Sequence, residues 1–337
     1  MRAVVAREYG PPETLRVEAL PDPVAGPGAV RVRVHAAAVN FPDLLLLANR
    51  YQISVPLLFT PGSELAGEVI DCGSGVSGFV AGDRVHGAML VGAFAEQAVL
   101  PAAALSRIPV GVGFPAAAAF GVAYTTAWGA LVSAAALRPG ETLLVLGAAG
   151  GVGLAGVELG QLLGARVIAA ASSAEKRALC MAKGAAAAID GSPEGLRERL
   201  REAAGKVGVN VVLDPVGGAA SEAALRSLAQ GGRHVVVGFA AGEIPRIPAN
   251  LLLLRNARLV GFELGGWRRH QAEAAQQADL TLQAWLASGR IAPHVGGRFP
   301  LEGVAEALRL VAERRALGKL LIEPGLATSR CPVHTIS

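Results

Sequence analysis

The residues Ala148-Ala-Gly-Gly-Val-Gly153 have the composition and spacing of a turn that binds phosphate groups. The match to the pattern G-x-G-x-x-G is incomplete, because Ala148 occupies the first glycine position. Glycines let the backbone approach a pyrophosphate closely, and the N-terminus of a following helix offers N–H groups and a positive dipole end. The turn residues predicted to bind a dinucleotide are Ala149, Gly150, Gly151, Val152 and Gly153.

The elements that must position this turn lie on both sides of it. A short apolar strand, Leu143–Leu146, leads into the turn, and a helix, Val152–Leu163, follows it. A second strand, Arg166–Ala171, comes next. An Ala/Gly-rich turn is often only a turn, but a βαβ unit of roughly 30 residues with glycines at its first crossing is the layout of a dinucleotide-binding site.

The end of the second strand carries the residues that distinguish NADPH from NADH. NAD sites usually place Asp or Glu there to bind the ribose 2′-hydroxyl, whereas this chain has Ala171. The run Ser172-Ser-Ala-Glu-Lys-Arg177 supplies hydroxyls and cations, which suit a 2′-phosphate. In a second interpretation, compatible with the first, Ser172 is the N-cap of the next helix and Glu175 completes a capping box. The sequence favours NADPH, with candidate contacts at Ser172, Ser173 and Lys176.

The composition is that of a globular α/β protein. The chain has 337 residues, enough for two domains, and is 52% hydrophobic. The formal net charge of +4 is spread out, and no basic block carries interleaved aromatic residues, so nucleic-acid binding is not favoured. Cys72, Cys180 and Cys331 are too far apart to suggest a disulfide framework or a metal cluster, which fits a reducing compartment such as the cytoplasm.

One uncharged run, Phe114 to Leu137, is long enough to be considered as a membrane span. It is mostly Ala with Gly, Thr and Ser, so it is only weakly apolar, and we expect a buried helix instead. The N-terminus carries charges where a signal peptide needs an apolar core, and its pattern is typical of a strand.

The chain has two regions with different secondary-structure patterns. Up to about residue 110, short alternating strands broken by Gly and Pro indicate an antiparallel, barrel-like β segment. From Thr142, strands and helices alternate, which implies a parallel sheet covered on both faces. The strands expected there, besides the two already given, are 187–190, 209–214, 233–238 and 259–263, and the further helices are 173–183, 193–204, 220–228 and 249–255.

The last part of the chain continues with mixed elements. After Trp267 we expect an amphipathic helix at 271–288, an extended segment at 293–299, a helix at 301–314 and a last strand at 319–323. The tail from Pro324 to Ser337 has no clear pattern, and disorder is one expectation for it.

Several segments together resemble the zinc-independent quinone oxidoreductases of the medium-chain dehydrogenase/reductase superfamily. The resemblance covers about residues 1 to 323, nearly the whole chain. The segments that carry it are Val39-Asn-Phe-Pro-Asp43 followed by Tyr51, Pro61-Gly-Ser-Glu64 with Gly67, Gly82-Asp-Arg-Val85, Ala148–Gly153, Asp214-Pro-Val-Gly-Gly218 and Gly318-Lys319. Together these segments are highly specific for the family.

The resemblance implies an α/β protein of split architecture. A GroES-like β-barrel catalytic domain would comprise residues 1–121 and 263–337, and a Rossmann domain with a doubly wound parallel sheet would comprise residues 122–262. It also implies NADPH as the cofactor, reduction of a small-molecule quinone, and a homodimer, since family members are commonly dimers.

The resemblance also bears on whether a metal is present. Related alcohol dehydrogenases bind catalytic zinc through a Cys and a His, whose positions correspond here to Asn40 and Ser63. An amide and a hydroxyl do not replace thiolate and imidazole in a zinc shell. The six histidines fall on different elements without ligand spacing. We therefore predict no metal, and a hydride transfer that needs little polarisation of a carbonyl.

Asn40 and Tyr51 are the catalytic candidates, because the amide and the phenol can donate hydrogen bonds to the acceptor or the cofactor. Simpler interpretations are a turn residue for Asn40 and a core aromatic for Tyr51. Asp43 and Glu64 are expected to hold backbone donors around the pocket. The remaining cofactor candidates come from the resemblance or from the carboxyl edge of the sheet, and they are Thr126, Val216, Gly238, Phe239 and Phe262.

Three functions remain open at this stage. The first is NADPH-dependent quinone reduction without a metal. The second is reduction of α,β-unsaturated carbonyls such as enones or enoyl thioesters, for which Arg50, Arg255 and the run Trp267-Arg-Arg269 are possible contributors to a basic rim. The third is a non-catalytic NADPH-binding protein, against which the presence of Asn40 and Tyr51 argues.

Overall fold

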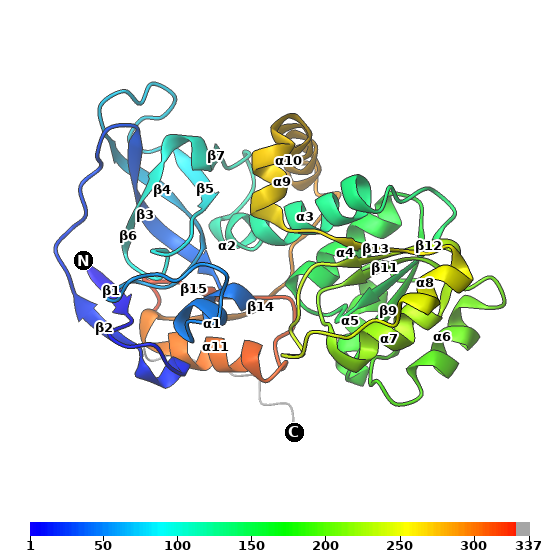
Figure 1. Ribbon diagram of the computed structural model, residues 1–337. Helices are drawn as coiled ribbons and strands as arrows, with labels where there is room; N and C mark the ends of the chain where they lie inside the picture. Colours follow the sequence, from blue (N-terminus) through cyan, green and yellow to red (C-terminus); the bar gives the residue numbers. More distant parts are fainter. Residues whose placement is uncertain (328–337) are drawn as a thin grey trace. The chain divides into compact units, whose positions relative to one another are not determined.

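The computed structural model describes residues 1–327, and the chain forms two compact units (Figure 1). The first consists of Met1–Val122 together with the chain from Ala292 onward, and the second of Ala123–Ile291. The domain boundaries expected from the resemblance assigned residues 263–291 to the split domain, whereas the structure groups them with the second unit. The cause is local packing, since Trp285 of helix α10 (Ala272–Ala287) lies edge-on to Trp128 at 5.5 Å between ring centroids.

The first unit is built around an antiparallel sheet. A seven-stranded sheet has the order β14-β15-β3-β4-β5-β7, with β6 added on β3, and β1 and β2 form a separate pair. The strands are β1 (Arg2–Val5), β2 (Arg16–Ala19), β3 (Ala29–Ala38), β4 (Glu64–Cys72), β5 (Arg84–Ala88), β6 (Gln97–Pro101), β7 (Leu105–Arg107), β14 (Val295–Phe299) and β15 (Lys319–Ile322). Pairing is antiparallel except between β14 and β15. This confirms the barrel-like β segment expected from the sequence.

Strand β3 is the centre of this sheet. Val30, Val32 and Val34 are buried, while Arg33 between them is exposed, as the period of two predicts. A β-bulge at His35 changes the register against β4. Across from the bulge, a Cβ at Gly67 would lie 2.0 Å from the carbonyl oxygen of Arg33, so only glycine lets the two strands approach this closely.

Short helices close the first unit. They are α1 (Phe41–Leu47), α2 (Phe114–Ala118) and α11 (Val304–Ala312), with 3₁₀ turns at Pro12–Thr14, Ala102–Ala104 and Leu301–Gly303. The sequence did not predict α1, because seven residues are too few to show a helical period. The helix expected at 301–314 begins as a 3₁₀ turn and becomes α-helical at Val304.

The second unit is a doubly wound α/β domain. Its six strands are parallel and have the order β10-β9-β8-β11-β12-β13. They are β8 (Thr142–Leu146), β9 (Arg166–Ala171), β10 (Ala187–Asp190), β11 (Val209–Asp214), β12 (Leu228–Val236) and β13 (Arg258–Gly261). The sequence placed the start of β12 five residues too late, at Arg233, because the preceding Gly231-Gly232 resembles a turn. The predicted Rossmann topology is confirmed.

Helices cover both faces of the parallel sheet (Figure 1). Leu144 of β8 and Ile168 of β9 belong to a core cluster with residues of α6 (Leu196–Ala204), α7 (Gly218–Arg226) and α8 (Ala249–Arg255). Helix α4 (Gly151–Leu162) lies on the opposite face. There a Cβ at Gly160 would lie 2.5 Å from Cδ2 of Leu143, so a small residue lets α4 pack closely on the sheet. The remaining helices are α3 (Gly121–Trp128), α5 (Ala174–Ala182), α9 (Leu264–His270) and α10.

The uncharged run Phe114 to Leu137 does not form the single buried helix that we expected. It contains α2, α3 and a π-helical turn at Gly129–Ala134. The run is largely buried within the protein, and no helix among the described residues is long and apolar enough to cross a membrane. Among the cysteines, Cys72 and Cys180 are free thiols, whereas Cys331 and the tail after residue 327 lie outside the described residues.

Candidate nucleotide-binding and active-site residues

The glycine turn after β8 has the shape that a phosphate cradle requires. Gly147 has a φ of +57°, and Gly150 is the N-cap of α4, without a side-chain cap. A Cβ at Gly153 would lie 2.3 Å from the carbonyl oxygen of Gly147 and 2.7 Å from Cα of Ala148, so this close approach requires glycine. The helix N-terminus is therefore brought against the turn with its N–H groups directed out of the helix end.

The strand order places this turn at the switch point of the sheet, between β8 and β11. Ligands of doubly wound sheets bind outside the carboxyl ends of the strands at such a point. Val216, after β11, lies with Cγ2 2.7 Å from where a Cβ of Gly147 would be. Phe239, after β12, lies with Cδ1 2.9 Å from where a Cβ of Gly217 would be. Three loops that carry predicted cofactor residues thus meet at one edge.

A buried polar network shapes the loop after β11. Asp214 accepts hydrogen bonds from the N–H groups of Val216 at 2.8 Å and Gly217 at 2.9 Å. Its other oxygen contacts the hydroxyl of Ser221 and Nε2 of His234, the latter at 2.8 Å. Burial opposes ionisation, but the interactions with His234, Ser221 and the Gly217 N–H together lower the pKa of Asp214. The main chain of Gly238 also bonds this residue, with its N–H 3.4 Å from the Asp214 carbonyl oxygen.

At the end of β9, the structure corrects the predicted helix cap. Ser173, and not Ser172, is the N-cap of α5, and its hydroxyl oxygen accepts from the N–H of Lys176 at 3.2 Å. The reason is that the extended chain continues one residue further than expected, so Lys176 and not Glu175 occupies the N3 position. The exposed hydroxyl of Ser172 is consequently not used as the cap.

Two other cofactor candidates are mainly buried in the second unit. Thr126 lies on α3 and is 7% exposed. The ring of Phe262 fills the space over Gly129, where a Cβ would lie 2.1 Å from it, and packs against Trp267 at 5.6 Å between ring centroids. These contacts give Phe262 a packing role within the unit.

Asn40 lies in the first unit, between the end of β3 and α1, among polar groups from four segments. Its side-chain amide nitrogen is 3.3 Å from Oγ of Ser63 and 3.3 Å from Oε2 of Glu64. Asp43 accepts the N–H of Asn40 at 2.7 Å, and Oε1 of Glu64 accepts the N–H of Val122 at 2.6 Å. The expectation that Asp43 and Glu64 hold backbone donors is confirmed.

The carboxyl of Asp43 is unusually placed for an acid, since it is only 1% exposed. Burial raises the pKa of Asp43 to about 6, although the Asn40 N–H, Ser63 and the charge of Lys319 act in the opposite direction. The side chain therefore titrates close to neutral pH, and its charge is costly to the folded state.

Lys319 is a member of this cluster to which the sequence analysis gave no role, although the segment Gly318-Lys319 contributed to the family resemblance. Its ammonium donates to Oδ1 of Asn40 at 2.5 Å, to the carbonyl oxygen of Val39 at 3.2 Å and to Oε2 of Glu64 at 3.2 Å. The lysine is 5% exposed although it begins an otherwise apolar strand, β15. A charge at a strand position whose neighbours are all buried was the signal that could have identified it.

Tyr51 lies four residues after the end of α1 and is half-buried. Its ring packs against the core of the first unit. Both the catalytic and the core interpretation of this residue are compatible with that position, because a tyrosine ring can pack while its hydroxyl reaches a polar partner.

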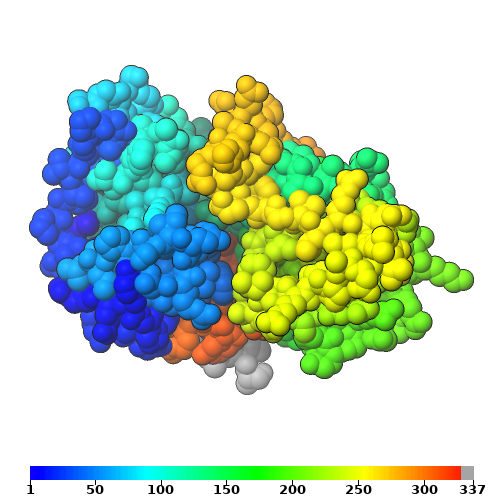
Figure 2. All heavy atoms as spheres, in the orientation of Figure 1, coloured from blue at the N-terminus to red at the C-terminus, as the bar shows by residue number. Residues whose placement is uncertain are grey.

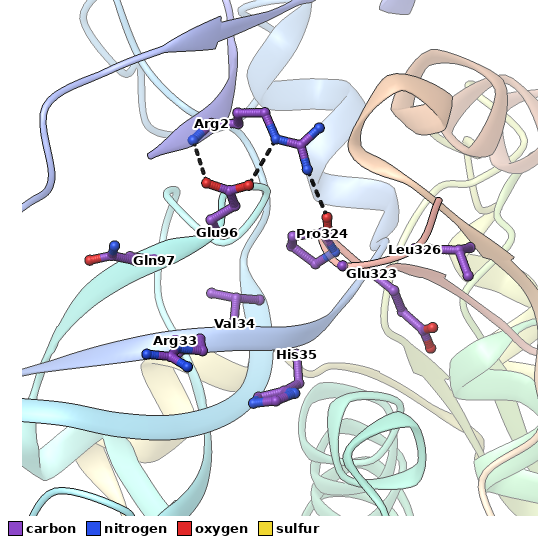
Figure 3. Close-up of a pocket in the computed structure, with 10 residues that line it drawn as sticks. Arg2, Arg33, Val34, His35, Glu96, Gln97, Glu323, Pro324 and Leu326 are labelled. Carbon is purple, nitrogen blue, oxygen red and sulfur yellow. Dashed lines mark hydrogen bonds and ion pairs between the residues drawn. The ribbon is translucent and has the colours of Figure 1, made fainter. Parts of the chain in front are cut away.

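A cavity of about 630 Å³ opens elsewhere in the first unit (Figure 3). It lies beside β3, between the strand ends of β6 and β15, at the bulge of His35. Figure 3 shows Glu96 turned toward Arg2, which it binds at 2.8 Å, on one side, and Arg33 and His35 on the other. The lining residues are Arg2, Arg33, Val34, His35, Glu96, Gln97, Glu323, Pro324, Gly325 and Leu326, and none of the predicted site residues is among them.

Comparison with known proteins identifies the family. Residues 26–110 match the family described as alcohol dehydrogenase GroES-like domain, and residues 151–280 match that described as zinc-binding dehydrogenase. Quinone oxidoreductase-like protein 2 of Mus musculus is 41% identical over 322 residues, which cover 95% of this chain and 91% of that protein. The chain belongs to the quinone oxidoreductase family of the medium-chain dehydrogenase/reductase superfamily.

Two further members support the assignment. Quinone oxidoreductase of Homo sapiens is 30% identical over 325 residues, covering 96% of this chain and 97% of that protein. The crystal structure of the Escherichia coli quinone oxidoreductase complexed with NADPH matches with a TM-score of 0.89 and 28% identity, over 96% of this chain and all of that one. The predicted fold class, a GroES-like domain with a Rossmann domain, is confirmed.

The family that matches residues 151–280 is described as a zinc-binding dehydrogenase, which raises the question of a metal site in this quinone oxidoreductase family member. Within residues 1–327, no group of three or more His, Cys, Asp or Glu side chains is arranged to hold a metal ion. The groups that surround Asn40 are an amide, a hydroxyl, two carboxyls and an ammonium. The ammonium of Lys319 donates hydrogen bonds to oxygens of Asn40 and Glu64, and these oxygens are thereby occupied as hydrogen-bond acceptors rather than presented as metal ligands.

Proposed function

We propose that this protein is an NADPH-dependent reductase of quinones that transfers hydride without a metal. The observation that carries the proposal is the glycine cradle at the switch point of the second unit, where a Cβ at Gly153 would lie only 2.3 Å from the carbonyl oxygen of Gly147. Membership in the quinone oxidoreductase family supports the choice of acceptor class.

The residues of the cradle fit a dinucleotide. The backbone N–H groups from Ala149 to Gly153 are proposed to bind its pyrophosphate, because the turn and the helix N-terminus present donors and a positive dipole end. Val216, Gly238 and Phe239 are proposed to border the same edge. When bound, NADPH supplies the hydride.

Selectivity for the 2′-phosphate is proposed to reside at the end of β9. The hydroxyl of Ser172 is exposed there, and Ser173 can still donate its proton while its oxygen caps α5. Lys176 supplies a positive charge in the first turn of that helix. A hydroxyl pair and a cation suit a phosphate better than a ribose hydroxyl, because charge-assisted hydrogen bonds are the stronger ones.

In the first unit, Asn40 and Tyr51 are proposed as the hydrogen-bond donors to the acceptor. Reduction of a quinone places negative charge on its oxygen, and preoriented donors stabilise such charge. Thr126 and Phe262 retain their proposed cofactor contacts, although both side chains are largely buried within the second unit.

The test combines purified protein with NADPH and follows loss of its absorbance with a naphthoquinone, an enone and crotonyl-CoA, each with and without a chelator. Rapid oxidation with the quinone and no effect of the chelator are expected. A preference for the enone or for crotonyl-CoA would replace the proposal by carbon–carbon double-bond reduction. Binding of NADPH without turnover of any acceptor would leave a non-catalytic NADPH-binding protein.

We further propose that the protein is a homodimer formed through the edge of the parallel sheet. Strand β13 ends that sheet, and an unpaired strand edge readily pairs with its own copy about a two-fold axis. Three large apolar side chains near this edge are exposed, namely Ile244 at 69%, Leu253 at 77% and Leu254 at 71%. The segment around residue 250 is at the surface (yellow in Figure 2).

Substitution at this surface tests the dimer. Leu253→Glu is expected to give a monomer in light scattering, whereas Leu280→Glu, at a leucine exposed on α10, should remain dimeric. A dimeric Leu253→Glu variant would contradict this arrangement.

A further inference from the structure

The cluster around Asn40 contains a buried ammonium group. Packing does not offset the free-energy cost of burying this charge. Lys319 is 5% exposed, and a buried cation is unfavourable by several kcal/mol unless it is paired and hydrogen-bonded. Its three N–H groups correspond to three oxygen partners, on Val39, Asn40 and Glu64. One of those partners is the proposed catalytic amide itself, and another is the carboxylate of Glu64 beside it.

The lengths of the hydrogen bonds on Asn40 are unequal. Its Oδ1 receives the ammonium at 2.5 Å, whereas its Nδ2 is 3.3 Å or more from Ser63, Glu64 and the carbonyl oxygen of Ala38. The distances from Nδ2 are at the long end for N–H···O bonds, whereas the distance from Oδ1 to the ammonium is short. The amide oxygen is therefore held firmly and the amide N–H groups only weakly.

We propose that Lys319 is a positioning residue for the reaction, which fixes the Asn40 carboxamide with its NH₂ group presented as the donor. An ammonium has no acceptor, so it can face only the oxygen of the amide and never the nitrogen. The opposite rotamer would bring two sets of donors together. Lys319 thus selects one of the two amide orientations, and an incoming acceptor oxygen can replace the weak partners of Nδ2.

Glu64 completes the arrangement from the other side. Its Oε2 is shared between the ammonium at 3.2 Å and the Asn40 amide at 3.3 Å, while Oε1 is held by the N–H of Val122. The lysine comes from β15 and Asn40 from the end of β3, 279 residues apart in the sequence. This inference rests on the proposed function, because it assumes that Asn40 donates to the acceptor.

The test is a double-mutant cycle between Lys319→Met and Asn40→Ala. Alone, Lys319→Met is expected to lower kcat about 10- to 100-fold, the usual range for loss of a group that orients a reacting side chain, with the KM for NADPH nearly unchanged. In the Asn40→Ala background the same substitution should lower kcat less than about twofold, since no amide is left to orient. Lys319→Arg should restore part of the loss.

A matched control is Lys183→Met in the second unit. Lys183 is also largely buried and pairs with Glu158 at 2.7 Å, but it lies outside the Asn40 cluster. Its removal should lower the melting temperature without changing kcat. A kcat of Lys319→Met equal to that of the wild type, or an equal loss in both backgrounds, would overturn the positioning role and leave only a structural one.

A second measurement keeps the inference separate from the proposed function. The side-chain amide resonances of Asn40, assigned by their loss in Asn40→Ala, should shift and exchange faster in Lys319→Met or, if that variant does not fold, in Lys319→Gln. They should be unaffected in Lys183→Met. Unchanged resonances would refute the role of Lys319 even if quinone reduction is observed. A wild type that oxidises no NADPH would remove the proposed function, and shifted resonances would then establish only that Lys319 orients the Asn40 amide.

Discussion

Substitution of Gly153 by alanine tests the cofactor cradle most directly. The new Cβ would stand 2.3 Å from the carbonyl oxygen of Gly147, and real contacts of this kind are not found below 3.0 Å, so the two segments must separate by at least about 0.7 Å. Because the opposing atoms belong to the backbone, no side-chain rotation relieves the contact. The N-terminus of α4 must therefore move away from the turn.

A displacement of this size is expected to weaken NADPH binding by roughly 10- to 100-fold, or about 1.4 to 2.7 kcal/mol, because misplacement near 1 Å typically has effects of this order. The strain should also lower stability by about 1 to 3 kcal/mol, as overpacking usually does. Fluorescence titration gives the dissociation constant directly.

Thermal unfolding provides an independent measure. NADPH at 100 times the wild-type Kd should stabilise the wild type by about 2.7 kcal/mol, but a variant with 100-fold weaker binding by only about 0.4 kcal/mol. Gly160→Ala on the same helix is the control, since its Cβ would meet side-chain atoms of Leu143 and Val167 and no backbone atom of the turn, so it should lower stability but leave the Kd nearly unchanged. A folded Gly153→Ala protein with the wild-type Kd would refute the cradle.

Three further predictions concern single side chains. Lys176→Ala should weaken NADPH about tenfold or more and NADH little, because only NADPH carries the 2′-phosphate, and titrations showing equal losses would assign Lys176 to the solvent. Tyr51→Phe should lower kcat while leaving the Kd for NADPH nearly intact, and steady-state rates equal to the wild type would return the residue to the core. The pKa of Asp43 is raised in the folded state from 3.8 to about 6, so its contribution to stability is complete below about pH 4 and is lost as the pH rises through 6. The free energy of unfolding of the wild type should fall by about 3 kcal/mol over that interval relative to Asp43→Asn, and parallel urea-denaturation curves for the two proteins would contradict it.

The elements of the second unit were predictable because their signals are local. Strands 143–146 and 209–214 are continuous apolar runs bounded by turns, and each was found within one residue of its predicted ends. The glycine turn could be identified because its close backbone contacts tolerate few other residues. Short elements such as α1 and α9 were missed, since seven residues give only a weak helical period, although α8, of the same length, was predicted.

The candidate site was predicted only in part. Asn40, Asp43 and Glu64 stand in recognisable segments, and the structure brings them together. Lys319 was not predicted as their partner, because nothing in the residues around it specifies which distant segment β15 will join. The helix cap was placed one residue early, at Ser172, because two successive serines offer equal capping groups and only the backbone conformation shows that Ser173 is used.

By itself, the amino-acid order determined the two secondary-structure patterns, the dinucleotide turn with its NADPH-type ending, and the family, because periodicity and glycine chemistry act over a few neighbouring residues. Tertiary structure alone decided that Lys319 bonds Asn40. It also decided that Phe262 fills the space over Gly129. These features depend on strand order and on side-chain packing between segments far apart in the chain. Both are set by the free energy of the whole fold and not by neighbouring residues.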